Sequence, residues 1–336
     1  MIFWKILTAL TDEILGDEID FLKLKELLEA LKQELYELTE FKNHHHPNHK
    51  DIQLKNGVAI GADWAALCLN DLIRSRQFMK GVLKAVEKLS KEKEGPIHIF
   101  YAGTGPFASL ILPLLLRYTS EEIRFHLLEI NEHTLFYLKR LIKTLEIEAY
   151  IKHIECADAS TYQIRYAEEI DILISETMQQ ALLKEQQVPI MLNLVPQLRE
   201  EVILIPSCIE LSLAYRKNGL KPGNIPLARY EKFLDLLCFD KNFIRAQANK
   251  LLHKKEPGSF ELCKEENFRR GIEEDTTSLV ILTYIQVFEE EWIGLKESSL
   301  TIPKLLQDFD TIDQHLEKIS LTYVIQEELG FSYEFS

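Results

Sequence analysis

The chain has 336 residues and a mass of 39.1 kDa, more than one hydrophobic core usually organises, so we expect two domains or one domain with a large extension. Hydrophobic residues make up 46% of it and charged residues 27%, which excludes collagen-like, low-complexity and disordered classes. Its 53 acidic and 39 basic residues give a formal charge of -14, the wrong sign for binding nucleic acid or an anionic membrane. We therefore expect neither partner and favour a cationic substrate.

The five cysteines form no Cys-x-x-Cys pair and lie mostly within apolar runs. This usage is typical of buried thiols in a reducing compartment, so we predict a cytoplasmic location. The first 20 residues contain one lysine and lack a small-residue cleavage site, so we do not expect a signal peptide there. No apolar stretch is long enough to predict a membrane-spanning helix.

Residues 1–45 are expected to form an N-terminal helical region. Leucines recur at helical spacing through residues 21–38, with lysine and glutamate on the other face. Residues 46–96 follow as a linker and helices, and the helical stretch spans about 62–91, ahead of Gly95 and Pro96, which stop it.

Four histidines, His44, His45, His46 and His49, lie beside a proline turn at the start of this linker. Their composition is that of a metal-binding tract, yet only Asp51 lies near enough in the sequence to complete a ligand set. We interpret the cluster as a solvated linker and predict no metal site.

Residues 97–206 alternate between apolar strands and helical stretches. We predict strands at 97–101, 123–130, 150–154, 170–175 and 202–205, and helices at 106–118, 132–145 and about 180–198. Alternation of this kind predicts a doubly wound, Rossmann-like parallel sheet. Ligands of such sheets bind at the carboxyl ends of the strands.

Residues 207–336 change to strand-like runs, at 210–215, 278–288, 321–327 and 331–335, which predict an antiparallel, β-barrel-like domain. Residues 228–253 have helical spacing instead, so we expect a helical arm there. The arm would present an apolar face that needs a partner. That partner is either a second subunit or the same chain, folded back on itself.

Three features at successive strand ends point to a nucleoside cofactor. Gly103, Thr104 and Gly105 form a turn after the first strand, where backbone can approach a ligand at a helix start. Glu129 ends the next strand and can accept both hydroxyls of a ribose. Asp158 follows the third strand, where its carboxylate can accept a hydrogen bond from an adenine amino group.

Two further acids follow the fourth strand, Glu176 and Glu185, nine positions apart. Two carboxylates that bracket a loop at the cofactor edge can clamp one planar cation, and guanidinium has the matching shape. The alternative interpretation is that these acids keep a surface helix soluble.

The run SETMQQALLKE at 175–185 resembles the double-glutamate loop of the protein arginine methyltransferases, which starts Ser-Glu-x-Met and carries its second Glu nine residues after the first. Residues 71–78, DLIRSRQF, are similar to that family's Asp-x-x-Arg-Thr-x-x-Tyr segment, whose Arg contacts the methionine carboxylate of S-adenosylmethionine. The Gly-Thr-Gly-Pro turn and the Leu-Ile-Pro at 204–206 also resemble family segments. The resemblance covers roughly residues 60–215.

The resemblance implies a class I S-adenosylmethionine-dependent methyltransferase, with residues 46–96 covering the cofactor site. It implies cofactor contacts by Arg74, Gly103, Thr104, Gly105, Glu129 and Asp158. Glu176 and Glu185 would be the catalytic clamp and Met178 a substrate-binding residue. The acceptor would be a guanidine-bearing small molecule, peptide or protein, and the arm at 228–253 would form a homodimer.

One family motif has no match here. Where the family has Thr-His-Trp on a barrel strand, with the His supporting the second glutamate, this chain reads Ile281-Leu282-Thr283. Two alternatives therefore stay open, a methyltransferase for a small natural-product N or O acceptor and a catalytically silent scaffold.

Overall fold

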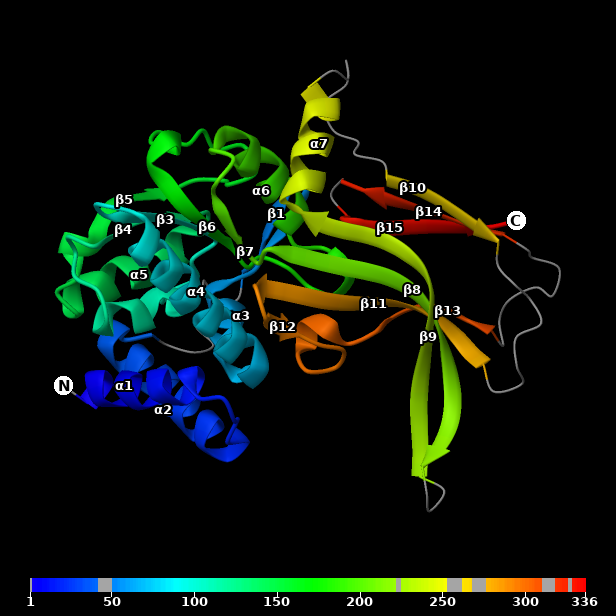
Figure 1. Ribbon diagram of the computed structural model, residues 1–336, viewed down its shortest axis with the longest axis horizontal. Helices are drawn as coiled ribbons and strands as arrows, with labels where there is room; N and C mark the ends of the chain where they lie inside the picture. Colours follow the sequence, from blue (N-terminus) through cyan, green and yellow to red (C-terminus); the bar gives the residue numbers. More distant parts are fainter. Residues whose placement is uncertain are drawn as a thin grey trace.

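The structure, a computed structural model, describes residues 2–41, 50–221, 225–252, 262–267, 276–309, 318–325 and 328–336. Two N-terminal helices lie beside an α/β unit, and antiparallel sheets extend from the other side of that unit (Figure 1). None of the helices in these ranges is both long and apolar enough to cross a bilayer.

The N-terminal helical region consists of α1 (Ile2–Leu15) and α2 (Phe21–Thr39), which bury leucines against each other and against the α/β unit. Asp20 caps α2, because its side chain accepts from the backbone N–H groups of Leu22 and Lys23 at 3.1 and 3.0 Å. The predicted linker histidines lie outside the described residues.

The segment ahead of the first parallel strand contains a short hairpin, β1 (Ile52–Leu54) and β2 (Gly57–Ala59), and then α3 (Ala62–Leu67), the 3-10 turn η2 (Cys68–Asn70) and α4 (Leu72–Glu92). The prediction of one helix over 62–91 was therefore wrong. The break falls at Asp71, which is extended and caps α4 through its contact with the Arg74 N–H at 3.2 Å.

The central sheet has five parallel strands in the order β5-β4-β3-β6-β7, which confirms the predicted parallel α/β sheet. The strands are β3 (Ile97–Ala102), β4 (Ile123–Glu129), β5 (Ile151–Cys156), β6 (Ile170–Ser175) and β7 (Ile203–Ile205), with α5 (Glu132–Thr144) after β4. The chain runs outward from β3 to β5 and then returns to β6 on the other side of β3. This reversal between β3 and β6 is the switch point at which open α/β sheets hold ligands.

Two helices predicted in this unit are different in the structure. Residues 109–116 form the 3-10 helix η3 (Ser109–Leu116), with Pro113 inside it, where a proline cannot donate to an α-helical ladder. The helix predicted over 180–198 is split into η6 (Gln180–Leu182), α6 (Gln187–Leu194) and η7 (Val195–Gln197), short turns on each side of one helix.

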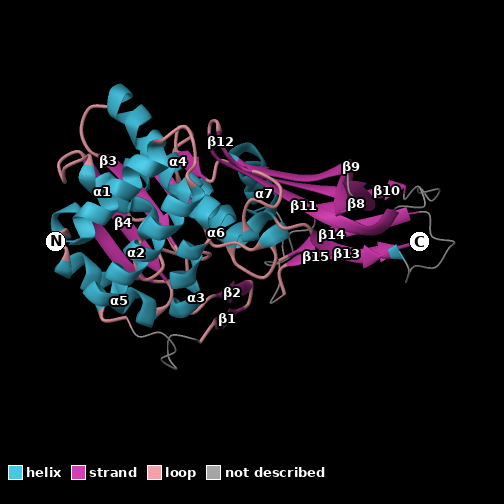
Figure 2. Cartoon of the chain, turned by 90° about the horizontal axis from the view of Figure 1, so that it is seen from below, coloured by secondary structure: helices cyan, strands magenta, loops and turns pink. Residues whose placement is uncertain are grey.

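The C-terminal part is antiparallel, as predicted, but its described strands form two open sheets and no closed barrel. The larger sheet contains β8 (Cys208–Lys221), β9 (Ile225–Asp240), β11 (Thr276–Phe288), β12 (Glu291–Ile293) and β13 (Lys304–Asp308), with η8 (Ser299–Thr301) between the last two. The smaller sheet contains β10 (Leu262–Asn267), β14 (Lys318–Val324) and β15 (Gly330–Phe335). Figure 2 shows these strands on the side opposite the N-terminal helices.

The predicted helical arm over 228–253 was wrong in its first half. Residues 228–240 belong to β9, and the helix is confined to α7 (Lys241–Leu252). The pairing with β8 shifts register twice and leaves Phe233 and Leu236 as extra residues on β9. These bulges break the alternation of a strand and imitate helical spacing in the sequence.

The apolar residues of this segment are packed within their own chain. The Phe233 ring stacks on Tyr215 with centroids 4.4 Å apart, and Ile244 on α7 is buried. Arg245 of α7 donates to the carbonyls of Leu198 and Arg199 at 3.0 and 2.7 Å. The helical face that suggested a homodimer is therefore absent as predicted, and the homodimer itself stays a prediction.

Candidate functional site

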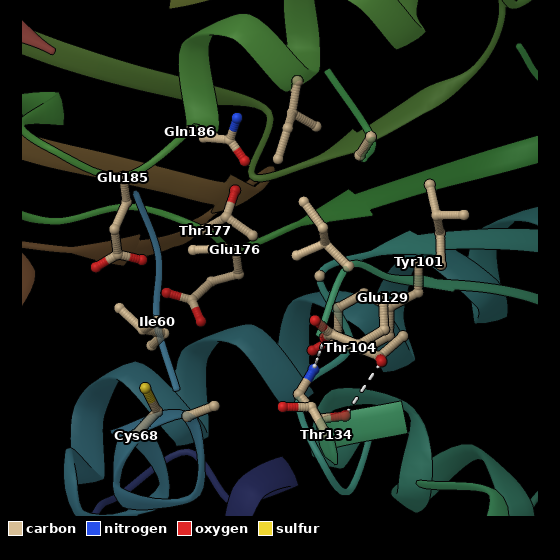
Figure 3. Close-up of a pocket in the computed structure, with 18 of the residues that line it drawn as sticks. Ile60, Cys68, Tyr101, Thr104, Glu129, Thr134, Glu176, Thr177, Glu185 and Gln186 are labelled. Carbon is tan, nitrogen blue, oxygen red and sulfur yellow. Dashed lines mark hydrogen bonds between the residues drawn. The ribbon is translucent and has the colours of Figure 1, made fainter. Parts of the chain in front are cut away.

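A cavity lies at the carboxyl ends of β3, β4 and β6, at the switch point of the parallel sheet (Figure 3). Its empty volume is about 960 Å³ with the open solvent at its mouth included. The β1–β2 hairpin, the segment from α3 to α4 and the loop after β6 contribute the other walls. The four charged residues among those that line it are Arg74, Glu129, Glu176 and Glu185.

The glycine turn forms one wall of this cavity. Gly103 and Gly105 have φ of +73° and +62°, a left-handed conformation that favours glycine. A Cβ on Gly103 would also lie 2.3 Å from Cγ2 of Thr177, which follows β6. Glycine is therefore required at position 103 by both the turn and the packing of two loops that line the cavity.

Glu129 is fixed between two loops at the end of β4. Its Oε2 accepts from the Gly105 N–H and its Oε1 from the Asn131 N–H, both at 3.0 Å. The side chain is 7% exposed, and burial raises its pKa against the opposing effect of these hydrogen bonds. The Ile130 N–H and the Thr104 hydroxyl also lower the pKa of this carboxyl, which lies on the cavity wall where a ligand can reach it.

Arg74 lies in the first turn of α4 and forms an ion pair with Glu176 across the cavity wall. Its Nη2 lies 2.5 Å from Oε1 and 2.6 Å from Oε2 of that carboxylate, and the two side chains are 11% and 9% exposed. Burial raises the pKa of Glu176, and Arg74 opposes that effect. The Nε of Arg74 is buried without an acceptor among the described residues, so it can still donate to an anionic ligand.

Glu185 provides the second carboxylate of the loop after β6, and Figure 3 shows it and Glu176 pointing into the same space. The residue is 9% exposed, and burial raises its pKa to about 7, with Arg74 opposing and Glu176 adding to the effect. The prediction that the two glutamates lie together is confirmed. Glu185 lies ahead of the helix and not within it as the predicted helix over about 180–198 implied, because α6 begins two residues later.

The loop between the two glutamates has an unusual backbone. Ala181, Leu182 and Lys184 have φ of 56°, 55° and 61°, although none of them is glycine. Conformations of this kind cost about 1–3 kcal/mol each and persist where the surroundings impose them. Such strain is concentrated at functional sites, which agrees with the position of this loop at the cavity.

Hydrogen bonds from other elements hold the loop in that conformation. Ala181 N–H donates to Oγ1 of Thr283 on β11 at 3.1 Å, and the Tyr323 hydroxyl on β14 donates to the Leu182 carbonyl at 2.6 Å. From the other side, the Val58 N–H donates to the Lys184 carbonyl at 2.9 Å. The C-terminal sheets and the β1–β2 hairpin thus position the double-glutamate loop.

Two predicted site residues lie outside the cavity wall. Asp158 accepts from the Ser160 N–H at 2.8 Å, and its neighbours Ala157 and Ala159 line the cavity in its place. Met178 is 2% exposed and buried behind the loop. The structure therefore does not bring either side chain to the site.

Several residues of the wall were missed by the sequence analysis. Tyr101 is buried at the end of β3, Cys68 comes from η2, and Thr134 on α5 has a buried hydroxyl without a partner among the described residues. Burial raises the pKa of the Cys68 thiol to about 11. None of the three belongs to a motif with a characteristic spacing. Only Tyr101 could have been found from the sequence, because it lies beside the glycine turn.

A scan against models of known protein families finds no match for this chain, and a search of curated proteins finds none either. Fold and site together define an α/β protein with a Rossmann-like parallel sheet and an acidic ligand cavity at its switch point.

Proposed function

We propose that the chain is an S-adenosylmethionine-dependent methyltransferase that N-methylates a guanidine group, of arginine or an arginine-like molecule. The proposal rests on one observation. An acid placed at a glycine turn, as in sites that bind a ribose, lies in the same cavity as two further glutamates. Glu129 ends β4 and the Glu176–Glu185 loop follows β6, the two strands that flank β3.

The residues present fit this cofactor. The Glu129 carboxylate on the cavity wall suits the hydroxyls of a ribose, and the glycine turn lets backbone approach a ligand closely. The orphaned Nε of Arg74 suits the carboxylate of the methionine portion. When bound, S-adenosylmethionine would supply an electrophilic methyl group.

The charge of the cavity also fits a cationic pair of ligands. One arginine and three glutamates give its wall a formal charge of -2 when all are ionised. S-adenosylmethionine carries a net charge of about +1, and a guanidinium acceptor adds another, so a filled cavity would be neutral. A neutral acceptor would leave one carboxylate of the wall without a counterion, so that carboxyl would have to take up a proton instead.

Each glutamate has a separate part in the proposed chemistry. Glu176 is already held by Arg74, so it would orient the guanidinium as a fixed acceptor, while Glu185 forms no ion pair within the described part of the chain. The two carboxylates would localise the charge of the guanidinium and leave one nitrogen free to react. With a pKa of about 7, Glu185 could then accept the proton that the product releases.

Methyl transfer from labelled S-adenosylmethionine tests the proposal. The purified chain would be offered free arginine, arginine-containing peptides and guanidine metabolites, and the products analysed by mass spectrometry. We expect label on a guanidine nitrogen. Transfer to a hydroxyl or amine instead would favour the small-molecule alternative, and lack of cofactor binding by calorimetry would favour the scaffold.

We also propose a cytoplasmic location. It rests on cysteine usage, and the described cysteines Cys68, Cys156, Cys208 and Cys238 are free thiols.

A further inference from the structure

Three histidines lie on one face of the parallel sheet, toward the amino ends of its strands and outside the cavity. His126 on β4 pairs directly with His153 on β5 and with Phe100 on β3, and His98 is two residues before Phe100. Paired residues and residues two apart on a strand share a face, so the three imidazoles form a row. Glu169, just before β6, lies at the same end.

The distances among three of these side chains match those of a metal site. His98 Nδ1 lies 3.0 Å from His126 Nε2 and 3.5 Å from Glu169 Oε2, and all three atoms lie within 4.8 Å of one another. Around a tetrahedral zinc ion with bonds of about 2.0–2.2 Å, ligand atoms stand about 3.4 Å apart. The distances of 3.0 and 3.5 Å are within half an ångström of that spacing.

The two imidazoles are in the protonation state that binds metal. His126 is 1% and His98 is 8% exposed, and burial lowers the pKa of both, that of His126 to about 3. Lys93, Lys152 and His153 lie near enough to add to this effect, and Glu169 opposes it at His98. Both rings are therefore neutral at pH 7 and carry a lone pair for a ligand.

The remaining acids near the row are already engaged. Asp171 is paired with Lys93 at 2.5 Å and Arg199 at 2.8 Å, and Glu155 accepts from Tyr162 and contacts His153. Glu169 has a weaker partner, since Lys152 lies 4.0 Å away and the carboxylate is 44% exposed. It is thus the acid that can move onto a metal ion, with solvent reaching it.

We propose that His98, His126 and Glu169 bind a divalent transition-metal ion of the zinc class, with water as the fourth ligand. Two imidazoles select such ions over Mg²⁺ and Ca²⁺, which prefer all-oxygen sites. Because the ligands come from β3, β4 and the turn before β6, the ion would tie three elements of the sheet together. Its role would be stabilising and independent of the proposed methyl transfer.

These ligands are dispersed along the chain without ligand spacing, so the sequence alone predicts no metal site. A test must remove two competing donor sets. One is the linker cluster of His44, His45, His46 and His49, and the other is Cys208 and Cys238, whose sulfur atoms lie 3.0 Å apart beside Glu210. A full-length background variant would replace the four histidines with Gln and the exposed Cys238 with Ser.

Calorimetric titration of this background variant with ZnCl₂ tests the proposal. We expect one bound equivalent that excess Mg²⁺ does not displace, and a higher melting temperature with zinc. Glu169→Gln should weaken binding at least about tenfold, since even outer partners of metal ligands cost 10–100-fold. The neighbouring exposed Glu168→Gln is the matched control and should bind zinc like the background variant.

Glu169 is exposed, so its variant should fold and circular dichroism would verify that. Absence of zinc binding in the background variant, or equal binding by Glu169→Gln and Glu168→Gln, would overturn the proposal. His98 and His126 would then be a neutral, hydrogen-bonded pair of the core.

Discussion

The Arg74 guanidinium contacts both carboxylate oxygens of Glu176, at 2.5 and 2.6 Å, and so joins the first turn of α4 to the end of β6. In the proposed function Arg74 belongs to the cofactor and Glu176 to the acceptor. Because the two side chains form an ion pair, the cofactor subsite and the acceptor subsite lie side by side and share this one contact. A change at Glu176 should therefore affect both ligands, whereas a change at Glu185 should affect the acceptor alone.

Removal of Arg74 should destabilise the fold. Arg74→Met would leave Glu176 buried without its cation, and breaking a buried pair in this way costs about 3–5 kcal/mol. Urea unfolding of the variant measures the loss. The double variant Arg74→Met with Glu176→Leu should recover most of it, and equal stability of the single and double variants would contradict the pairing.

Loss of Glu129 should weaken cofactor binding. Glu129→Ala removes an acceptor aimed at the ribose, so the affinity for S-adenosylmethionine should fall by about 1.5–3 kcal/mol, the scale of hydrogen bonds to a charged group. Isothermal titration calorimetry gives the value. Glu132→Gln, an exposed acid in the first turn of α5, is the control. An unchanged dissociation constant in a folded Glu129→Ala protein would remove Glu129 from the site.

Stability should depend on pH through Glu185. Its pKa rises from 4.5 to about 7 on folding, so between these values the folded chain holds a proton that the unfolded chain has lost. The free energy of unfolding should therefore fall as pH rises from about 4.5 to about 7, with a Glu185 contribution on the order of 3 kcal/mol. Glu185→Gln should flatten this part of the profile. Parallel profiles for the two proteins would show that Glu185 is not buried as described.

Thr283 should matter through the loop that it holds. Thr283→Val keeps the shape of the side chain but leaves the buried Ala181 N–H without its acceptor, which costs about 1–3 kcal/mol. We expect a lower melting temperature and slower turnover with an unchanged affinity for the cofactor. Thr283→Ser retains the hydroxyl and should restore both. If the two variants behave alike, the hydrogen bond has no part in positioning the loop.

The parallel sheet could be predicted because its strands are short, apolar and separated by helical stretches, a pattern that few other folds share. The bulged strand β9 could not. Its extra residues Phe233 and Leu236 break the alternation, and only the pairing with β8 shows that the segment is extended. The breaks at Asp71 and after Leu182 also depend on tertiary contacts that no local pattern reports.

The site was predictable where its residues sit at strand ends, as Glu129 and Glu176 do. Spacing alone could not separate Asp158 from its neighbours Ala157 and Ala159, because one residue decides which side of a turn faces the cavity. The support of the loop by Thr283 was hidden as well, since the contact spans 102 positions.

The central claim is that the cavity clamps a guanidinium beside S-adenosylmethionine, and Glu185→Gln tests it most directly. The variant keeps the size of the side chain, loses its charge and leaves the Arg74–Glu176 pair in place. Turnover on the guanidine acceptor should fall at least about a hundredfold, the cost of losing a charge-stabilising group at the reacting centre, while the dissociation constant of the cofactor stays at the wild-type value. Turnover equal to that of the wild type would contradict the guanidine clamp.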